Sequence, residues 1–157
     1  YEVVDLAQWP LPMDDEPWIP AMDRYTQPHT RAWSEKIADA DAVVFVTPQY
    51  NWGYPAALKN AIDFIYAEWN NKAAGFVSYG SPGGASAVEH LRGIMAEVQV
   101  ADVRAHVSMS LYTDFENFTT FKPAATHEAQ LATLVDQVIT WSAALKTVRQ
   151  QQAAKAA

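Results

Sequence analysis

The segment Thr47–Phe64, TPQYNWGYPAALKNAIDF, is the part of the sequence that decides the fold. It follows the apolar run Ala42–Val46, which is continuous and rich in valine, as is typical of a strand buried on both faces. After Pro55 the apolar residues recur at helical spacing: Leu58, Ala61, Ile62, Ile65 and Trp69. The segment therefore predicts a strand, a loop and a helix. Ligands of open α/β sheets bind at the carboxyl ends of the strands, where this loop lies.

A second unit of the same kind follows the turn signal Asn70-Asn71. Ala73–Tyr79 predicts another buried strand, and Tyr79–Gly84 its terminal loop. The glycines in that loop permit a close backbone approach or a positive φ. From Ala85 an apolar stripe predicts a helix: Val88, Leu91, Met95 and Val98. Both loops are expected at the same edge of the sheet.

The remaining segments complete an alternation of strands and helices. A helix is predicted from Pro28, which suits a first helical turn, an edge strand over Val103–Ser108, and a last helix with Thr126 as its N-cap. We predict a strand over Tyr1–Leu6 and a frayed tail over Gln150–Ala157. Alternating strands and helices indicate parallel strands joined by right-handed crossovers, hence a three-layer α/β sandwich, here a single domain over residues 1–157.

Two long loops interrupt this pattern. Ala7–Pro20 contains four prolines, which forbid regular structure, and an acidic run, Asp14–Glu16, that is interpreted as solvated. Met109–Pro123 is rich in aromatic residues, for which a core or interface role is favoured over ligand contact. Trp9 and Trp18 are expected to pin the first loop onto the core or a partner subunit.

Composition narrows the classes of partner. The net charge of −7, without a lysine or arginine cluster, argues against nucleic acid or an anionic membrane as partner. The chain has no cysteine, which excludes disulfides and thiolate metal sites and fits a cytoplasmic protein. No spacing of histidine and carboxylate predicts a metal site, and no phosphate loop of the NTPase type is present.

Two motifs together resemble one known family. The first consists of Pro48, Tyr50, Asn51, Pro55, Leu58, Lys59, Asn60 and Asp63, and the second is Ser78–Gly84, SYGSPGG. They are similar to the motifs of the NAD(P)H-dependent FMN reductases, a family of flavodoxin-like proteins that includes quinone, azo-dye and chromate reductases. The resemblance extends more loosely from Val3 to about Val107.

The resemblance implies a parallel sheet in the order 2-1-3-4-5, with Tyr1–Leu6 as its second strand. The first strand, the phosphate loop and the first helix would precede Tyr1, so we expect a fragment; a naturally short chain is the alternative. The resemblance also implies FMN as cofactor, NADPH or NADH as reductant, a small-molecule electron acceptor, and a homodimer or homotetramer. Because the flavin carries the hydride chemistry, no catalytic residue is assigned.

The cofactor-binding residues implied by the resemblance lie in the two loops: Pro48, Gln49, Tyr50, Asn51, Trp52, Tyr79, Gly80, Ser81, Gly83 and Gly84. Backbone N–H groups of the first loop would meet the flavin carbonyls, and its aromatic rings would cover the apolar end of the ring system. Many family members have glutamate in place of Gln49 and a small residue in place of Trp52. These departures put subunit pairing and the choice of acceptor in question.

Two other functions fit parts of the same pattern. A flavodoxin-like electron carrier would transfer single electrons to protein partners and oxidise little NAD(P)H directly. A scaffold that has lost flavin binding is the third hypothesis. The helix motif Pro55–Asp63 favours the reductase, and measurement of FMN binding separates the scaffold from the other two.

Overall fold

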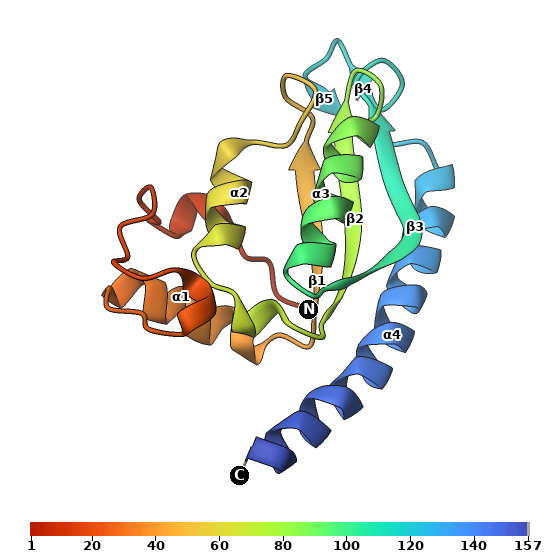
Figure 1. Ribbon diagram of the computed structural model, residues 1–157. Helices are drawn as coiled ribbons and strands as arrows, with labels where there is room; N and C mark the ends of the chain where they lie inside the picture. The colour runs from red at the N-terminus through yellow and green to blue at the C-terminus, as the bar shows by residue number, and fades with distance from the viewer. Residues whose placement is uncertain (157) are drawn as a thin grey trace.

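The computed structural model describes residues 1–156 as a parallel sheet flanked by helices (Figure 1). The strands are β1 (Ala42–Pro48), β2 (Ala73–Gly80), β3 (Ala101–Ser110), β4 (Phe115–Glu116) and β5 (Thr120–Phe121). The α-helices are α1 (Pro28–Asp39), α2 (Ala56–Asp63), α3 (Ala85–Glu97) and α4 (Thr126–Ala156). Short 3₁₀ turns are η1 (Leu6–Gln8), η2 (Pro20–Met22) and η3 (Ala67–Trp69). None of the helices among these residues has the length and apolarity that a membrane span requires.

The central sheet has three parallel strands in the order β1-β2-β3. Pro48 at the end of β1 lies opposite Tyr79, which lies opposite Met109 of β3. The carboxyl ends of the strands therefore meet at one edge, as the alternation of strands and helices predicts. β2 is buried along most of its length, as expected of a strand covered on both faces. For β1 that expectation is wrong: Val43 and Val44 are half-buried and Val46 is 67% exposed, because β1 is an edge strand of the described sheet.

Each face of the sheet has its own apolar core. On one face, helices α1, α2 and α3 pack over β1 and β2; the fully buried members include Trp33, Ile62, Phe64, Phe76, Leu91 and Met95. On the other face, Leu134 and Val138 of α4 pack against Val103 and Val107 of β3. Gly75 permits this approach, because a Cβ there would lie 2.9 Å from both α4 side chains. The two cores make the three layers predicted from the sequence.

The first residues do not form the predicted strand. Tyr1–Asp5 is irregular and exposed, and η1 follows at Leu6. Within residues 1–156, β1 pairs only with β2. The Tyr1–Asp5 backbone therefore lacks the ladder of hydrogen bonds that a strand needs; Glu2 is held instead by an ion pair with Lys36.

Two predictions near the C-terminus also need correction. The loop after β3 contains a small antiparallel hairpin, β4–β5. Helix α4 begins with Thr126 as its first residue, rather than as its N-cap, and continues through the segment predicted to fray, as far as Ala156; Ala157 lies outside the described residues. The run of alanine, glutamine and lysine after Arg149 has high helix propensity, which outweighed the weak apolar pattern used for the prediction.

The acidic run in the first loop is only partly solvated. Glu16 accepts hydrogen bonds from the N–H and hydroxyl of Thr26 at 2.8 and 2.7 Å and from the N–H of Gln27 at 2.9 Å. Burial raises its pKa, but these donors outweigh burial and bring the pKa down to about 2. Glu16 thus fixes the residues that precede α1. Trp9 packs edge-on against Trp33 as expected, whereas Trp18 is about half exposed.

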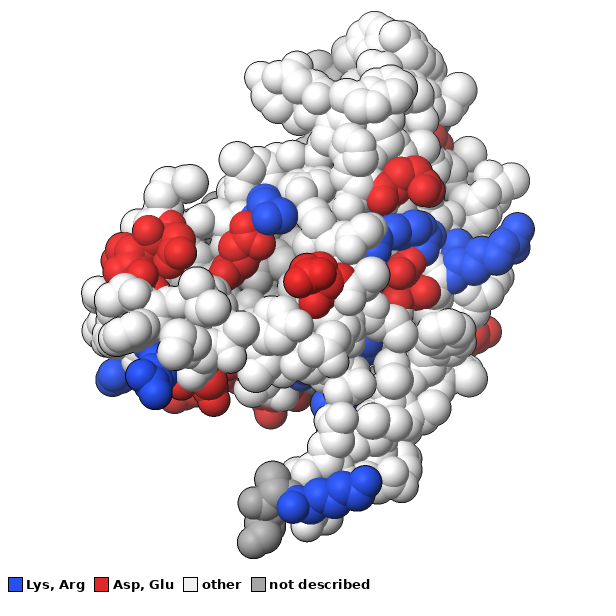
Figure 2. Space-filling view, in the orientation of Figure 1, with Lys and Arg blue, Asp and Glu red and all other residues white. Residues whose placement is uncertain are grey.

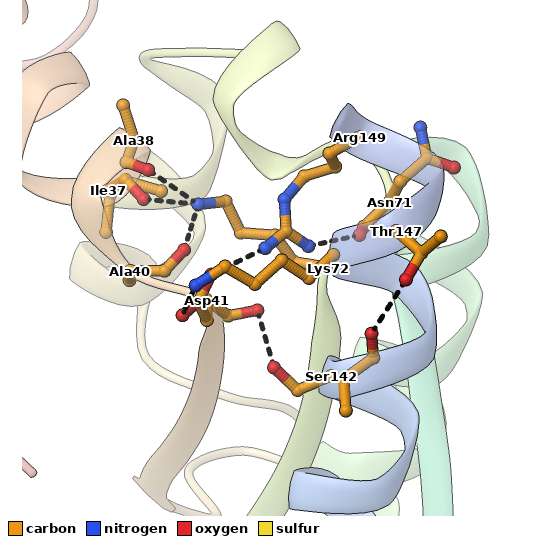
Figure 3. Close-up of polar contacts among 11 residues, drawn as sticks. Ile37, Ala38, Ala40, Asp41, Asn71, Lys72, Ser142, Thr147 and Arg149 are labelled. Atoms are coloured by element: carbon orange, nitrogen blue, oxygen red, sulfur yellow. Dashed lines mark hydrogen bonds and ion pairs between the residues drawn. The ribbon is translucent and has the colours of Figure 1, made fainter. Parts of the chain in front are cut away.

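A buried lysine joins α1 to the sheet at the amino ends of the strands, opposite the edge where the two loops lie (Figure 3). The Lys72 ammonium donates to the carbonyl oxygens of Ile37, Ala38 and Ala40 where α1 ends. The Ile37 carbonyl also accepts from the N–H of Ala40 at 3.1 Å. Carbonyls at the end of a helix carry its negative dipole end, which a cation satisfies. Burial lowers the pKa of Lys72 to about 8, with a further contribution from the charge of Arg149.

Helix α4 is attached at the same place. Lys146 and Arg149 of α4 each pair with Asp41 at 2.8 Å, and Arg149 also donates to the carbonyl of Asn71 at 2.7 Å. Both α1 and α4 are therefore fixed to the amino ends of β1 and β2. The loops predicted to bind a ligand lie at the carboxyl ends of the strands. The contacts that hold α1 and α4 are therefore separate from the predicted site.

Candidate functional site

The two predicted loops lie side by side where β1 and β2 end. The N–H of Gln49 donates to the carbonyl oxygen of Tyr79 at 2.7 Å, which extends the ladder of the two strands by one bond. The Gln49 side chain accepts from the N–H of Ser86 at 3.2 Å, in the first turn of α3. Gln49 thus joins the first loop to the helix that follows the second.

The first loop is a tight turn with two residues in the left-handed region. Tyr50 and Gly53 exchange backbone hydrogen bonds of 2.8 and 3.0 Å. Asn51 has φ of 46° and Trp52 φ of 71°, the pattern of a type I′ turn. Asparagine tolerates this conformation, but for a bulky side chain it costs about 1–2 kcal/mol. Strain of this kind is often found at ligand-binding positions.

The strained turn presents two aromatic rings and two backbone donors to solvent. Tyr50 and Trp52 are each 70% exposed. The N–H of Tyr50 is used within the turn, but the N–H groups of Asn51 and Trp52 have no acceptor among residues 1–156. The turn can therefore bond a ligand carbonyl and cover an apolar ring at the same time.

The second loop is shaped by two glycines at positive φ. Gly83 has φ of 80° and Gly84 φ of 81°. A Cβ on Gly83 would lie 2.1 Å from the Ser108 hydroxyl oxygen, and one on Gly84 2.7 Å from the Ser78 side chain. Only glycine therefore lets this turn rest on β2 and β3. Gly84 is also the N-cap of α3, so the positive end of that helix opens at the loop.

Aromatic residues of the β4–β5 hairpin extend this surface. Phe115 lies 6.3 Å from the ring of Tyr79 and 5.3 Å from that of Phe121, and Tyr112 contacts Phe118 edge-on at 5.7 Å. Tyr112, Phe118 and Phe121 remain mostly exposed. In Figure 2 the upper end of the molecule, where the hairpin lies, carries few charged side chains. Glu116 of β4 and Lys122 form an exposed ion pair at the hairpin, so the apolar surface is limited to the aromatic rings. Exposed aromatic rings of this kind suit a flat aromatic ligand.

A polar cavity of about 310 Å³ lies beside the second loop. Its lining includes Ser81, Gly83, Ser110, Asp114 and His127. The buried Asp114 carboxylate accepts from the N–H groups of Ser110 and Ala124 at 2.8 and 2.9 Å and pairs with His127 Nε2 at 2.8 Å. Asp114 thus ties the end of β3 to the start of α4.

The two members of this ion pair have shifted pKa values. Burial alone would raise the pKa of Asp114, but the N–H groups of Ala124 and Ser110, with His127, hold it below its ordinary value. The pKa of His127 is raised, first by its hydrogen bond to Gln130 and then by Asp114. His127 Nδ1 and Nε2 both face acceptor oxygens, which the doubly protonated ring satisfies.

The ten residues predicted to bind a cofactor are thus brought together in two adjoining loops: Pro48, Gln49, Tyr50, Asn51 and Trp52 in the first, and Tyr79, Gly80, Ser81, Gly83 and Gly84 in the second. The sequence did not single out the side chains that support the second loop, above all Ser108 and Asp114. Ser108 lies beside Ser78 only because β3 pairs with β2, and the sequence alone does not show this pairing. Asp114 lies in the loop Met109–Pro123, which was interpreted from its aromatic residues alone.

Comparison with known proteins places the chain in one group. The family described as NADPH-dependent FMN reductase matches residues 1–114, well over half of the 157 residues. The chain is 59% identical over 100 residues to an NAD(P)H-dependent FMN reductase of Schizosaccharomyces pombe, with 60% of this chain and 50% of that protein covered. It is 51% identical over 100 residues to one of Saccharomyces cerevisiae, with 60% and 52% covered.

A quinone reductase of Escherichia coli is 34% identical over 99 residues, with 59% of this chain and 49% of that protein covered. The chain thus spans about half the length of these relatives. Among solved structures, the flavoenzyme NAD(P)H:(acceptor) oxidoreductase of Paracoccus denitrificans superposes with a TM-score of 0.61 at 22% identity, covering 84% of this chain and 78% of that one. At this identity the likeness establishes a shared fold.

The close contact at Gly84 predicts a sharp difference between two glycine substitutions. Gly84→Ala is expected to lower the free energy of unfolding by at least about 2 kcal/mol, because its Cβ would strike Ser78 in a backbone conformation that alanine avoids. Gly93→Ala, in the exposed middle of α3 with open space around it, is expected to raise that free energy by about 0.5–1 kcal/mol. Urea unfolding of both variants measures the difference, and equal effects would contradict it.

The Asp114–His127 pair predicts a pH-dependent difference between the wild type and Asp114→Asn. The contribution of Asp114 is complete above about pH 3.8, its ordinary pKa, and is lost as pH falls through its lower folded value. The contribution of His127 is complete below about pH 6.5 and is lost as pH rises through its higher folded value. The stability difference should therefore peak between pH 4 and 6.5, at about 1.5–3 kcal/mol.

Urea unfolding from pH 3 to 8 measures this profile. Asp63→Asn is the matched control, since Asp63 makes only an exposed pair with Lys59, at 2.6 Å, and should change stability by less than about 0.5 kcal/mol. A difference for Asp114→Asn that stays constant across this range would refute the assignment of the pair.

Proposed function

The chain belongs to the NADPH-dependent FMN reductase family, and from this premise we propose that it forms the flavin-binding part of an NAD(P)H-dependent reductase that uses FMN. The reaction would pass a hydride from NADPH or NADH to a small-molecule acceptor of the quinone type. Relatives named as FMN reductases and as a quinone reductase support this choice of donor and acceptor.

The residues of the two loops fit the isoalloxazine ring system of FMN. That ring is flat, apolar at one end and rich in acceptor atoms at the other. The first loop offers the N–H groups of Asn51 and Trp52 beside two exposed aromatic rings. The second loop offers a glycine turn that lies close against β2 and β3, at the positive end of α3. These two features match the two ends of the flavin.

We assign the residues as follows. Asn51 and Trp52 would donate their N–H groups to acceptor atoms on the ring edge, and the Tyr50 and Trp52 side chains would cover its apolar end. Gly80, Ser81, Gly83 and Gly84 would lie against its pyrimidine part, with Pro48, Gln49 and Tyr79 holding the two loops in place. FMN, when bound, supplies the hydride chemistry between nicotinamide and acceptor.

The work of the chain is then binding, orientation and electrostatics. The fixed N–H donors and the positive end of α3 favour negative charge on the ligand at the Gly84 loop. The exposed rings of Tyr50 and Trp52 would keep water from one side of a flat ligand bound where the two loops meet, which we call the slot. No side chain of the two loops needs to act as nucleophile or general base.

The same proposal includes assembly into a homodimer or homotetramer. The exposed aromatic side chains of the hairpin and of Trp52 support such an assembly. A single observation carries the assignment of function: two loops from neighbouring parallel strands bring free backbone donors, uncharged aromatic rings and the positive end of α3 to one edge of the sheet. Their sequences are those in which the family resemblance is strongest.

The direct test of this function is reduction of bound flavin. The chain is incubated without oxygen with FMN and then mixed with NADPH or with NADH. The proposal predicts loss of the oxidised flavin absorbance within minutes and its return when a benzoquinone is added. Persistence of the absorbance with both nucleotides would refute the reductase, and FMN that fails to stay with the chain in equilibrium dialysis would refute flavin binding as well.

The strained turn predicts that Trp52→Gly weakens flavin affinity without lowering stability. Glycine relieves about 1–2 kcal/mol of left-handed strain and gives back part of it through unfolded-chain entropy, so the free energy of unfolding should stay constant or rise. Loss of the aromatic contact should weaken FMN binding about three- to tenfold. Urea unfolding and FMN fluorescence titration measure the two effects.

Trp18→Ala is the control for this prediction. Trp18 is also a partly exposed tryptophan, but it lies in the first long loop, where it stacks on Arg24. It should leave FMN affinity unchanged. Unchanged affinity in Trp52→Gly as well would show that this ring does not contact the flavin.

A further inference from the structure

A chain of hydrogen bonds runs beneath the second loop from β3 to the Gly83 carbonyl. His106 Nε2 lies 2.7 Å from the Ser78 hydroxyl oxygen, and that hydroxyl lies 2.7 Å from the carbonyl oxygen of Gly83. The Ser108 hydroxyl donates to the same carbonyl oxygen, also at 2.7 Å. Ser78 of β2 is paired with Ser108 of β3, and His106 lies two residues before Ser108 on the same strand. The side chains of these three residues have no part in the function proposed above.

The donors and acceptors in this series of hydrogen bonds fix the position of the His106 imidazole proton. The Gly83 carbonyl can only accept, so the single hydroxyl proton of Ser78 goes to it. Ser78 must then accept from His106, which places the imidazole proton on Nε2. Burial lowers the pKa of His106, and the nearby charge of Arg92 lowers it further, while Glu89 acts in the other direction. At neutral pH the ring is therefore neutral, with Nδ1 bare.

Holding the Gly83 carbonyl also fixes the next N–H group. The described peptide bonds are all trans, and in a trans peptide the C=O and the following N–H point in opposite directions. With the Gly83 oxygen held by the Ser78 and Ser108 hydroxyls, the Gly84 N–H points to the opposite side of the peptide. It lies beside Gly80, whose Cβ, if present, would be 3.5 Å from the Gly84 nitrogen and 3.0 Å from Gln49 Cβ.

The Gly84 N–H thus points toward the place where the two loops meet. No acceptor for it is found among residues 1–156. It is also the first N–H at the positive end of α3, where a partially negative acceptor is favoured. A buried donor of this kind calls for a partner, and a ligand in the slot between the loops would supply one.

We propose that His106 is a positioning residue: through Ser78 it fixes the Gly83–Gly84 peptide so that the Gly84 N–H is aimed at an acceptor atom of the bound flavin. This inference rests on the proposed function for the identity of the ligand. The orientation of the Gly83–Gly84 peptide and the protonation state of the His106 imidazole do not depend on that function. His106 touches no part of the slot and acts only through the serine.

The first test needs no flavin. Nitrogen-15 NMR of the flavin-free chain at pH 7 is expected to show His106 protonated on Nε2 and bare on Nδ1. His106→Leu should shift the amide resonance of Gly84, and His106→Gln, whose side-chain N–H can replace that of the imidazole, should restore it. The Nδ1-protonated tautomer, or a Gly84 resonance indifferent to both variants, would overturn the proposal.

The second test uses bound FMN. His106→Leu is expected to weaken FMN binding about tenfold and to move the flavin midpoint potential to a more negative value. The Gly84 N–H stabilises the more negatively charged reduced ring, and the variant weakens this hydrogen bond. His106→Gln should recover both quantities. His29→Leu, which removes a histidine paired with Asp15 far from the loops, should change neither.

The outcomes separate the two claims. If His106→Leu changes the free energy of unfolding but leaves FMN affinity and the flavin midpoint potential unaltered, His106 is merely structural and the proposal is overturned. If the wild type retains no FMN, the proposed function and the aim of the Gly84 N–H at flavin both fail, and the NMR result alone then decides whether His106 sets the peptide orientation.

Discussion

The site depends on the contact of two glycines with two serines. Gly83 and Gly84 adopt positive φ angles and rest so closely on Ser78 and Ser108 that neither has room for a Cβ. Because of this contact the turn after β2 ends against the sheet, α3 starts at once, and the Gly83 carbonyl meets two hydroxyl donors. The turn is thereby held close to the sheet, and the positive end of α3 is brought next to the first loop.

The first loop lies beside this turn because parallel strands end together. Pro48 lies opposite Tyr79, and the hydrogen bond from Gln49 to Tyr79 holds the two loops at the distance of adjacent strands. The Gln49 side chain also joins this loop to α3, since its amide oxygen accepts from the N–H of Ser86 at the start of that helix. The strained Asn51–Trp52 turn then presents donors and rings that a relaxed turn would direct elsewhere.

Much of this arrangement could be predicted because it follows from local pattern. Continuous apolar runs predicted β1 and β2, helical stripes predicted α1, α2 and α3, and their alternation predicted the parallel order. Contacts that depend on strand pairing could not be predicted: Ser108 supports Gly83 only because β3 lies beside β2, and Asp114 pairs with a histidine from α4. Tyr1–Leu6 was wrongly predicted as a strand because an apolar pattern does not show whether a neighbouring strand is present.

The most direct test of the central claim is an amide NMR map of the chain titrated with FMN. The account predicts that the largest shifts fall on two short segments, residues 49–53 and 80–85, with Asn51, Trp52 and Gly84 among the strongest. Shifts concentrated on another surface, such as α1 or the C-terminal half of α4, would contradict the claim that these two loops form one flavin slot.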